Sequence, residues 1–467
     1  MEEKLERKYG LFTAICLVVG TVIGSGVFFK AQAVLETTGG NMILGIASWI
    51  ITGLLMIACS VQFAVMATKY QKVNGVVDYA EATCGKAFGY YMAWFLVNMY
   101  YPAMTGVLAW VSARYFGEIL GWTAASSDVM TLACLILIGS YALNALSPRL
   151  AGKFQVSATV IKLIPICLMA VVGTLFGVFQ GTLPANFAEV VGEPAGGTVG
   201  SGLFAAVVAT VFAYDGWIVA TSINAELKNP KKNLPLALIF GSLIVVAAYV
   251  LYFVGVAGGA RTAVLIEKGS PIAFSNIFGK VGGVFLSVFV VVSCLGTLNG
   301  LMLATTRGMY SLAVRNEGPN PKMFSQVDGA TNMVTNSSIW GLLICCVWMV
   351  YFYGANLSSG WFGYFNFDAS ELPIVSIYAM YIPMFVMWMK KEKDLGVFKR
   401  YLLPGFAVVS CAFMVFAAIY AHGITPYLAT KDKGEFSCPV LFYLIVFAGI
   451  MLIGALLRKP KANLAIK

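Results

Sequence analysis

Charged residues, histidine and clustered cysteines are all scarce in this sequence. Charged residues make up 11% of the 467 residues, and the only histidine is His422. The ten cysteines stand singly apart from Cys345 and Cys346, with neither metal-ligand spacing nor an extracellular pairing pattern. Because no cluster of histidine, cysteine and carboxylate residues is present, we expect no metal, no cofactor and no catalytic residues, and therefore not an enzyme.

A cleavable leader and a long hydrophilic stretch are also lacking. The sequence Met1-Glu2-Glu3-Lys4 leads directly into the first apolar run, which has no small-residue cleavage site. No segment between apolar runs is long enough for a separate soluble domain. We therefore expect residues 1–467 to form a single integral membrane domain.

Apolar residues, by contrast, make up 59% of the chain, and the mean hydropathy is +0.82. About 20 consecutive apolar residues are enough for a helix to cross a bilayer. The sequence predicts an all-α polytopic membrane protein with twelve transmembrane helices, at 11–35, 43–68, 87–116, 129–147, 154–178, 200–224, 235–259, 281–313, 336–354, 371–389, 401–421 and 438–457.

The net charge of +10 would suggest a nucleic-acid partner in a soluble protein, but here the loops account for it. With the N-terminus inside, 23 of the 31 Lys and Arg residues fall on the inside, 7 fall on the outside, and Lys162 lies within a span. Positive charge thus faces the anionic cytoplasmic leaflet. We expect both termini to be cytoplasmic and no binding of nucleic acid.

The first apolar run contains an interruption at Gly24-Ser25-Gly26. Glycine is a poor helix former, and unwound backbone is tolerated in hydrocarbon only where it lines a cavity or is buried in protein. One interpretation is a binding site made of main-chain N–H and C=O groups. The other is a close helix–helix contact, since Gly20 and Gly24 form a Gly-xxx-Gly pair.

A second interruption lies five spans later, at Phe212-Ala213-Tyr214-Asp215-Gly216. Paired breaks in spans one and six indicate a transporter built from a 5+5 inverted repeat, with its substrate site near the membrane midplane. We expect the first repeat at 11–178, the second at 200–389, and two additional helices at 401–457. Half-helix ends at such breaks suit the carboxylate and ammonium of an amino acid.

Two residues of the second break have more than one interpretation. Asp215 is an ionisable group inside the membrane, which is expensive and by default functional. It could cap the second half-helix, contact the charged side chain of a substrate, or carry a proton. Phe212 could fill the core or cover the substrate as an aromatic lid.

Lys162 lies well inside span five, where a lysine costs about 2.5–3.5 kcal/mol on insertion scales. Snorkelling to the surface is the simple alternative. At this depth we instead expect the ammonium to bond the carbonyls freed at the first break. It would there take the place of a sodium ion, which predicts sodium-independent transport.

These motifs resemble the amino acid–polyamine–organocation superfamily, specifically its L-type amino acid transporter branch and bacterial members of the serine/threonine or alanine/serine/cysteine exchanger type. The resemblance covers spans one to eight, is looser from span nine onward, and rests on Gly20–Phe28, Lys162–Ile166, Phe212–Trp217, Glu226–Pro230 and Leu298–Gly300 with Arg307. It implies the LeuT-like fold, alternating access and amino acid exchange.

The resemblance also implies roles for individual residues. The substrate carboxylate would bind the main-chain N–H groups of Gly24, Ser25 and Gly26. The amino group would bind carbonyls near Ile23 and at Phe212, with Ala213 close by. Further residues carried over are Phe212 as the occluding aromatic, Lys162 at the sodium position, and Tyr249 and Asn299 as gating or site-lining groups, for which interhelical hydrogen bonding is the alternative.

Eukaryotic members of this branch carry a cysteine after span three for a disulfide to a partner glycoprotein. The corresponding loop, Phe116–Asp128, has no cysteine. We therefore expect a stand-alone transporter in a bacterial inner membrane, without a disulfide-linked heavy subunit. No second intramembrane carboxylate accompanies Asp215, which favours small neutral substrates such as alanine, serine, threonine and cysteine.

Other classes of protein fit the sequence less well. A proton-coupled symporter would need a relay, for which Asp215 and Lys162 are the candidates, and an exchanger of cationic and neutral amino acids also remains open. A channel would need a continuous polar pore, and a membrane enzyme would need paired acid and base groups. A scaffold or receptor would leave the two matched breaks unexplained.

Overall fold

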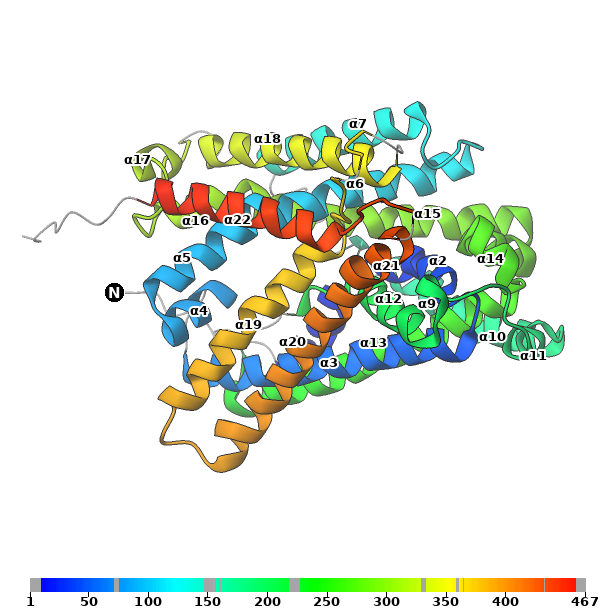
Figure 1. The fold of residues 1–467 in the computed structure, drawn as a ribbon, viewed down its shortest axis with the longest axis horizontal. Helices are drawn as coiled ribbons and strands as arrows, with labels where there is room; N and C mark the ends of the chain where they lie inside the picture. Colours follow the sequence, from blue (N-terminus) through cyan, green and yellow to red (C-terminus); the bar gives the residue numbers. More distant parts are fainter. Residues whose placement is uncertain are drawn as a thin grey trace, which may run out of the picture.

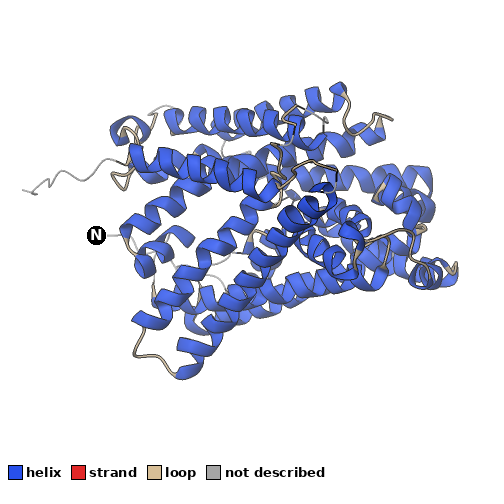
Figure 2. Ribbon diagram, in the orientation of Figure 1, coloured by secondary structure: helices blue, strands red, loops and turns tan. Residues whose placement is uncertain are grey.

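The computed structural model describes residues 10–70, 75–146, 154, 157–158, 161–217, 227–328, 333–357, 361–363, 365–431 and 433–458. Within these ranges the fold is helical and contains no β-strand (Figure 2). Apolar side chains of successive helices form an extended buried core, and a second, smaller buried cluster lies between α5 (Lys86–Phe95), α16 (Gly308–Ala313) and α17 (Pro321–Phe324). Residues 1–9 and 459–467 at the two chain termini lie outside the described residues.

The helices follow the apolar runs of the sequence. The first half of the chain contains α1 (Leu11–Val22), α2 (Gly26–Thr37), α3 (Met42–Lys69), α4 (Val76–Cys84), α5 (Lys86–Phe95), α6 (Tyr101–Ile119), α7 (Ser127–Leu146), α9 (Leu163–Leu168), α10 (Thr174–Phe179), α11 (Thr182–Ala188) and α12 (Val199–Val211). The second half contains α13 (Pro230–Gly259), α14 (Thr262–Lys268), α15 (Ser270–Thr306), α16 (Gly308–Ala313), α17 (Pro321–Phe324), α18 (Thr335–Phe352), α19 (Leu372–Lys391), α20 (Leu403–Ile419), α21 (Thr425–Lys431) and α22 (Pro439–Leu457).

Several long helices contain single π-helical turns. These turns are η1 (Leu96–Tyr100), η2 (Met169–Gly173), η5 (Tyr353–Leu357), η6 (Phe398–Leu402) and η7 (Tyr420–Ile424). Turns η1, η2 and η7 lie between α-helical segments, whereas η5 lies at the end of α18 and η6 at the start of α20. π-Turns inside helices are often found at functional sites. Pro102 follows η1 in the first turn of α6, where its missing N–H is tolerated.

Among the described residues, eight helices are long and apolar enough to cross a membrane. The count rises to nine if α9–α10 and the adjoining α11, which are bent by 83° at their junction, are taken as one span. Helices α1 and α12 are apolar but short, as expected for halves of interrupted spans. The structure therefore establishes a multi-pass helical membrane protein, and the full count of twelve spans goes beyond this criterion.

The long helices pack side by side in one bundle (Figure 1). Helix α3 lies along α13, α6 packs on α15, and α19 and α20 form an antiparallel pair. Helices α4, α16 and α17 lie at one end of the bundle, whereas α2, α11 and α14 lie toward the other (Figure 1). The connection from Phe179 to Val199 is partly helical because α11 forms within it.

Glycines allow one especially close contact, between α13 and the helix that contains η2 and α10. A Cβ atom on Gly255 would lie 1.9 Å from the carbonyl oxygen of Met169, and one on Gly258 would lie 2.1 Å from that of Gly173. A Cβ atom on Gly177 would likewise lie 2.3 Å from Cα of Gly258. Any side chain at these glycines would push the two backbones apart, so we name this contact the glycine seam.

Candidate functional site

The two predicted breaks meet in the structure. Helix α1 ends at Val22 and α2 begins at Gly26, and Ile23 between them adopts an extended conformation with φ −64° and ψ 101°. Helix α12 ends at Val211, and residues 212–216 form turns. A Cβ atom on Gly26 would lie 2.6 Å from Cα of Ala213, so the two interrupted backbones are in direct contact.

The carboxyl end of α1 leaves main-chain carbonyls without helical partners, and two side chains bond them. Nζ of Lys162, which is only 5% exposed, donates to the carbonyl of Gly20. The Tyr249 hydroxyl lies 3.1 Å from the carbonyl oxygen of Val22 and 2.9 Å from that of Ala213. Tyr249 therefore bridges the two breaks, which is the interhelical hydrogen bonding that the sequence left open.

The amino end of α2 is the part of the site suited to an anion. The main-chain N–H groups of Ser25 and Gly26 have no acceptor among the described residues. The Ser25 hydroxyl is buried beside the Cys294 thiol. Free N–H groups at a helix N-terminus, with the positive end of the helix dipole, attract a carboxylate.

Thr297 of α15 lines the site beside Gly24. A Cβ atom on Gly24 would lie 3.3 Å from Oγ1 of Thr297 and 3.6 Å from its Cγ2. Nothing in the sequence singles out this threonine, because its only signal is its place on the helix that packs behind the break. The space beside Gly24 is thus small and partly polar.

Asp215 is partly buried and accepts a hydrogen bond from the Tyr100 hydroxyl. Tyr100 is the last residue of η1, so a π-turn in the third predicted span aims its phenol at the second break. The half-helix that Asp215 could cap, and Glu226 of the motif 226–230, lie outside the described residues. The capping role therefore stays a prediction, and Tyr100 is a partner that sequence reasoning missed.

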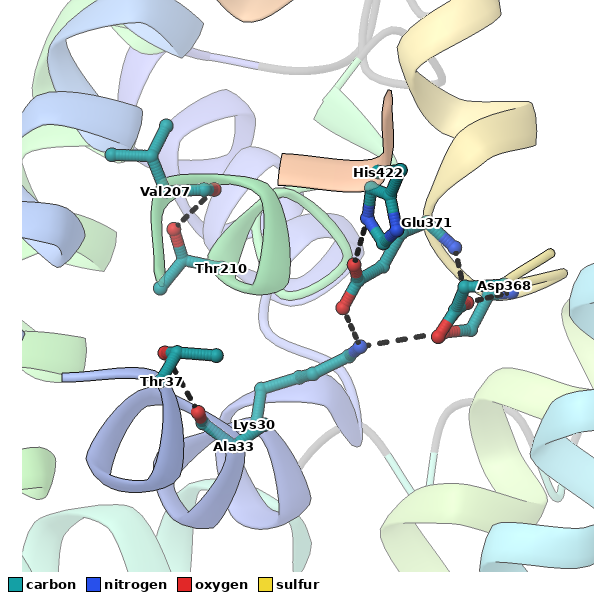
Figure 3. Close-up of polar contacts among 9 residues, drawn as sticks. Lys30, Ala33, Thr37, Val207, Thr210, Asp368, Glu371 and His422 are labelled. Atoms are coloured by element: carbon teal, nitrogen blue, oxygen red, sulfur yellow. Dashed lines mark hydrogen bonds and ion pairs between the residues drawn. The ribbon is translucent and has the colours of Figure 1, made fainter. Parts of the chain in front are cut away.

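Phe212, the first residue of the second break, packs against the first break and lies near a buried charge. Its ring lies 5.2 Å from that of Phe29, and Nζ of Lys30 lies 5.7 Å from its centre. Lys30 in turn lies 2.6 Å from Oε1 of Glu371, and Oε2 of Glu371 lies 3.0 Å from Nε2 of His422 (Figure 3). We name these three residues the ionic cluster.

Sequence reasoning did not combine the ionic cluster, although each member had a local signal. It counted no carboxylate besides Asp215 within the spans, whereas Glu371, the first residue of the tenth predicted span, is buried in the structure. Lys30 lies inside the first apolar run, Glu371 begins the tenth, and His422 directly follows the eleventh. Asn299, by contrast, is 4% exposed and accepts a hydrogen bond of 2.8 Å from Asn144 of α7. This contact favours an interhelical role for Asn299 over a site-lining one.

Two interrupted helices that meet inside a bundle of membrane-crossing helices define a multi-pass membrane protein with a buried, main-chain-lined site. Residues 9–452 match the family model described as amino acid permease. The chain therefore belongs to the amino acid permease family, which is a family of transporters rather than enzymes.

Individual relatives cover most of the chain. The serine/threonine exchanger SteT of Bacillus subtilis (strain 168) is 29% identical over 405 residues, which are 86% of this chain and 87% of that protein. The b(0,+)-type amino acid transporter 1 of Oryctolagus cuniculus is 29% identical over 332 residues, covering 69% and 66%. The cystine/glutamate transporter of Homo sapiens is 25% identical over 337 residues, covering 69% and 64%.

Proposed function

We propose that this protein exchanges small neutral L-amino acids across a membrane by alternating access, without sodium. The observation that carries the proposal is the contact between Gly26 and Ala213, which joins two interrupted helices at one point. A site formed by helix ends offers N–H groups and carbonyls together, as a zwitterion requires. The similarity to a serine/threonine exchanger supports the choice of substrate and of exchange.

In this proposal the substrate carboxylate binds the N–H groups of Gly24, Ser25 and Gly26, and the amino group binds the carbonyls of Ile23 and Phe212. Phe212 covers the bound substrate. The Ala213 carbonyl faces the Tyr249 hydroxyl, which lies 2.9 Å away, so Ala213 contributes shape rather than an acceptor.

Lys162 would act as a fixed cation in place of sodium. Its contact with the Gly20 carbonyl supports this role, because carbonyls at a broken helix are the groups that would otherwise bind the ion. Asp215 with Tyr100 would hold the second break in position. Neither role requires a metal or a cofactor.

The proposal includes the arrangement expected from the sequence. In this arrangement the protein has twelve spans, with repeats at 11–178 and 200–389 and additional helices at 401–457. Both termini lie in the cytoplasm of a bacterium. The protein also has no disulfide-linked heavy subunit. Cysteines placed in the site and labelled from each side would test alternation, because only a carrier exposes them to both sides in turn.

The first experiment is radiolabelled alanine uptake by the purified protein in liposomes. The lumen is either empty or preloaded with unlabelled alanine or serine, and sodium or pH gradients are imposed separately. Uptake that requires internal amino acid and ignores both gradients is expected. Uptake into empty liposomes driven by a proton gradient would replace exchange with symport, and uptake of only lysine and arginine would overturn the choice of neutral substrates.

Two substitutions test the site itself. Gly24→Leu should reduce uptake at least about 100-fold, because the side chain would fill the carboxylate site beside Thr297. Gly139→Leu on α7 is the matched control, since a Cβ atom there meets nothing within 4 Å. Lys162→Ala should slow exchange, with Lys280→Ala as its exposed control. Normal kinetics of Gly24→Leu or Lys162→Ala would refute the corresponding role.

A further inference from the structure

The ionic cluster joins three elements that are far apart in the sequence. Lys30 comes from α2, Glu371 directly precedes α19, and His422 lies in η7 between α20 and α21. Figure 3 shows both oxygens of the Glu371 carboxylate occupied, one by the ammonium and one by the imidazole. The side chains of Lys30, Glu371 and His422 are only 5%, 10% and 19% exposed.

Charges around the imidazole come from few groups. Asp368 lies beside the cluster, and its Oδ1 accepts hydrogen bonds from the main-chain N–H groups of Ser370 and Glu371. Helix α12 packs on η7 and carries no titratable side chain. The titratable groups of the other helices packed on η7 make no polar contact with His422 among the described residues; they are Cys411 on α20, Tyr427 and Lys431 on α21, and Tyr443 on α22.

Helix α2 connects the ionic cluster to the first break. It begins at Gly26 against Ala213, and it carries Lys30 over the Phe212 ring. If the site opens on the side of α2, which rests on the proposed function, Lys30 moves away from Glu371. A buried carboxylate that loses its cationic partner is strongly unfavourable, so another positive charge is needed there.

We propose that the Glu371–His422 pair binds a proton whenever Lys30 leaves and releases it when Lys30 returns. One proton passes from hydronium to the neutral imidazole, so an O–H bond breaks as an N–H bond forms and water is left. The Nε2–H of the imidazolium donates to Glu371, and the reverse transfer later returns the same proton to water. Because the proton enters and leaves on the same side, the pair makes opening sensitive to pH on that side without proton-driven transport. Lys30 and the proton are alternative counter-charges for one carboxylate.

The single histidine makes this measurable on the whole protein. Isotope-labelled histidine in the purified transporter gives one imidazole NMR signal, whose midpoint of titration can be followed from pH 5 to 9 without substrate. Lys30→Met should move the midpoint upward by about one pH unit or more, since the imidazolium becomes the only cation on Glu371. Glu371→Gln should move it downward, because the accepting carboxylate is lost.

Arg315→Met is the matched control, because Arg315 pairs with Asp78 of α4 in a different cluster. It should leave the His422 midpoint unchanged. An unchanged midpoint in Lys30→Met, or a signal in the wild type that does not titrate, would overturn the proposal. If Lys30→Met does not fold, Glu371→Gln alone decides, since an unchanged midpoint there also refutes it.

Hydrogen exchange measured without substrate separates this inference from the proposed function. Hydrogen exchange of the α2 amides, corrected for intrinsic rates, should show at least about threefold more opening at pH 6 than at pH 8, and the difference should vanish in His422→Gln. Persistence of the difference in His422→Gln would refute the pH-sensitive pair. Absence of amino acid exchange in liposomes would refute the proposed function alone, because the titration and the α2 amides are measured without substrate.

Discussion

Two groups of ion pairs lie toward different ends of the bundle, and they differ in how much water reaches them. The ionic cluster of Lys30, Glu371 and His422 is buried between three helical elements. Arg315 pairs with Asp78 at 2.8 Å and with Glu81 at 3.3 Å, and these side chains line a cavity of about 310 Å³. We name this second group the open cluster.

The comparison shows why similar distances do not mean similar energies. In the ionic cluster the Lys30 and Glu371 side chains are only 5% and 10% exposed, so each of these two charges depends on its partner. In the open cluster the Arg315 side chain is 22% exposed, and solvent can replace part of what a missing partner supplied. A buried pair can therefore control a conformational change, whereas an open pair mainly adds a modest local contact.

The largest effect is expected where the buried charge is left unpaired. Lys30→Met should destabilise the protein by about 3–5 kcal/mol at pH 8, since Glu371 then lacks its ammonium. Thermal or denaturant unfolding of the purified protein measures the loss. The double variant Lys30→Met/Glu371→Gln removes both charges and should recover more than half of it. A double variant no more stable than Lys30→Met would show that lost packing, not lost charge, is responsible.

A smaller effect is expected for the open cluster. Arg315→Met should cost about 1–2 kcal/mol, between the values typical of exposed and of buried pairs. The same unfolding assay at the same pH allows direct comparison with Lys30→Met. If Arg315→Met and Lys30→Met lose equal free energy of unfolding, the two clusters do not differ as described.

Salt should separate the two clusters further. The Debye length falls from about 10 Å at 0.1 M salt to about 3 Å at 1 M, and buried pairs are screened much less than exposed ones. Double-mutant cycles for Arg315 with Asp78 should therefore give a coupling that shrinks as salt increases. The coupling of Lys30 with Glu371 should stay constant, and a parallel decrease would mean that salt ions screen the ionic cluster as well.

The smallest effect is expected at Asp394, which lies 2.7 Å from Lys69 but is 68% exposed in its side chain. The hydrogen bond from Lys69 holds the pKa of Asp394 below its ordinary value. A lowered pKa contributes stability that is present above the unfolded pKa and is lost as pH falls through the folded pKa. Asp394→Asn should therefore lower stability slightly at pH 7 and remove this acid-side dependence, so that variant and wild type converge as pH falls, as followed by unfolding between pH 3 and 7.

The sequence predicts the breaks better than it predicts their partners. Gly24 and Gly26 indicate an interruption because glycine and membrane depth leave few alternatives, and Lys162 indicates a buried acceptor for the same reason. In the structure α1 indeed ends before Gly24, and Lys162 contacts Gly20. Both predictions depend only on one segment of the sequence and on its surroundings, the hydrocarbon of the bilayer.

The partners depend instead on how distant helices pack, which no local pattern encodes. Tyr100 reaches Asp215 only because η1 adds a π-turn before α6. Thr297 lies beside Gly24 only through the path of α15. The same holds for the ionic cluster, since Lys30 and Glu371 are 341 residues apart.

The glycine seam has a consequence for how the protein is made. The helix of Lys162 contains a charge that favours the aqueous phase, and its close partner α13 is synthesised only later. Gly255 follows Lys162 by about 90 residues, which at 5–20 residues per second takes about 5–20 s. During that interval the helix that follows Lys162 lacks its contact with α13. Stable insertion of the span that contains Lys162 should therefore require α13. In a chain truncated before Gly255, this span should remain accessible to water.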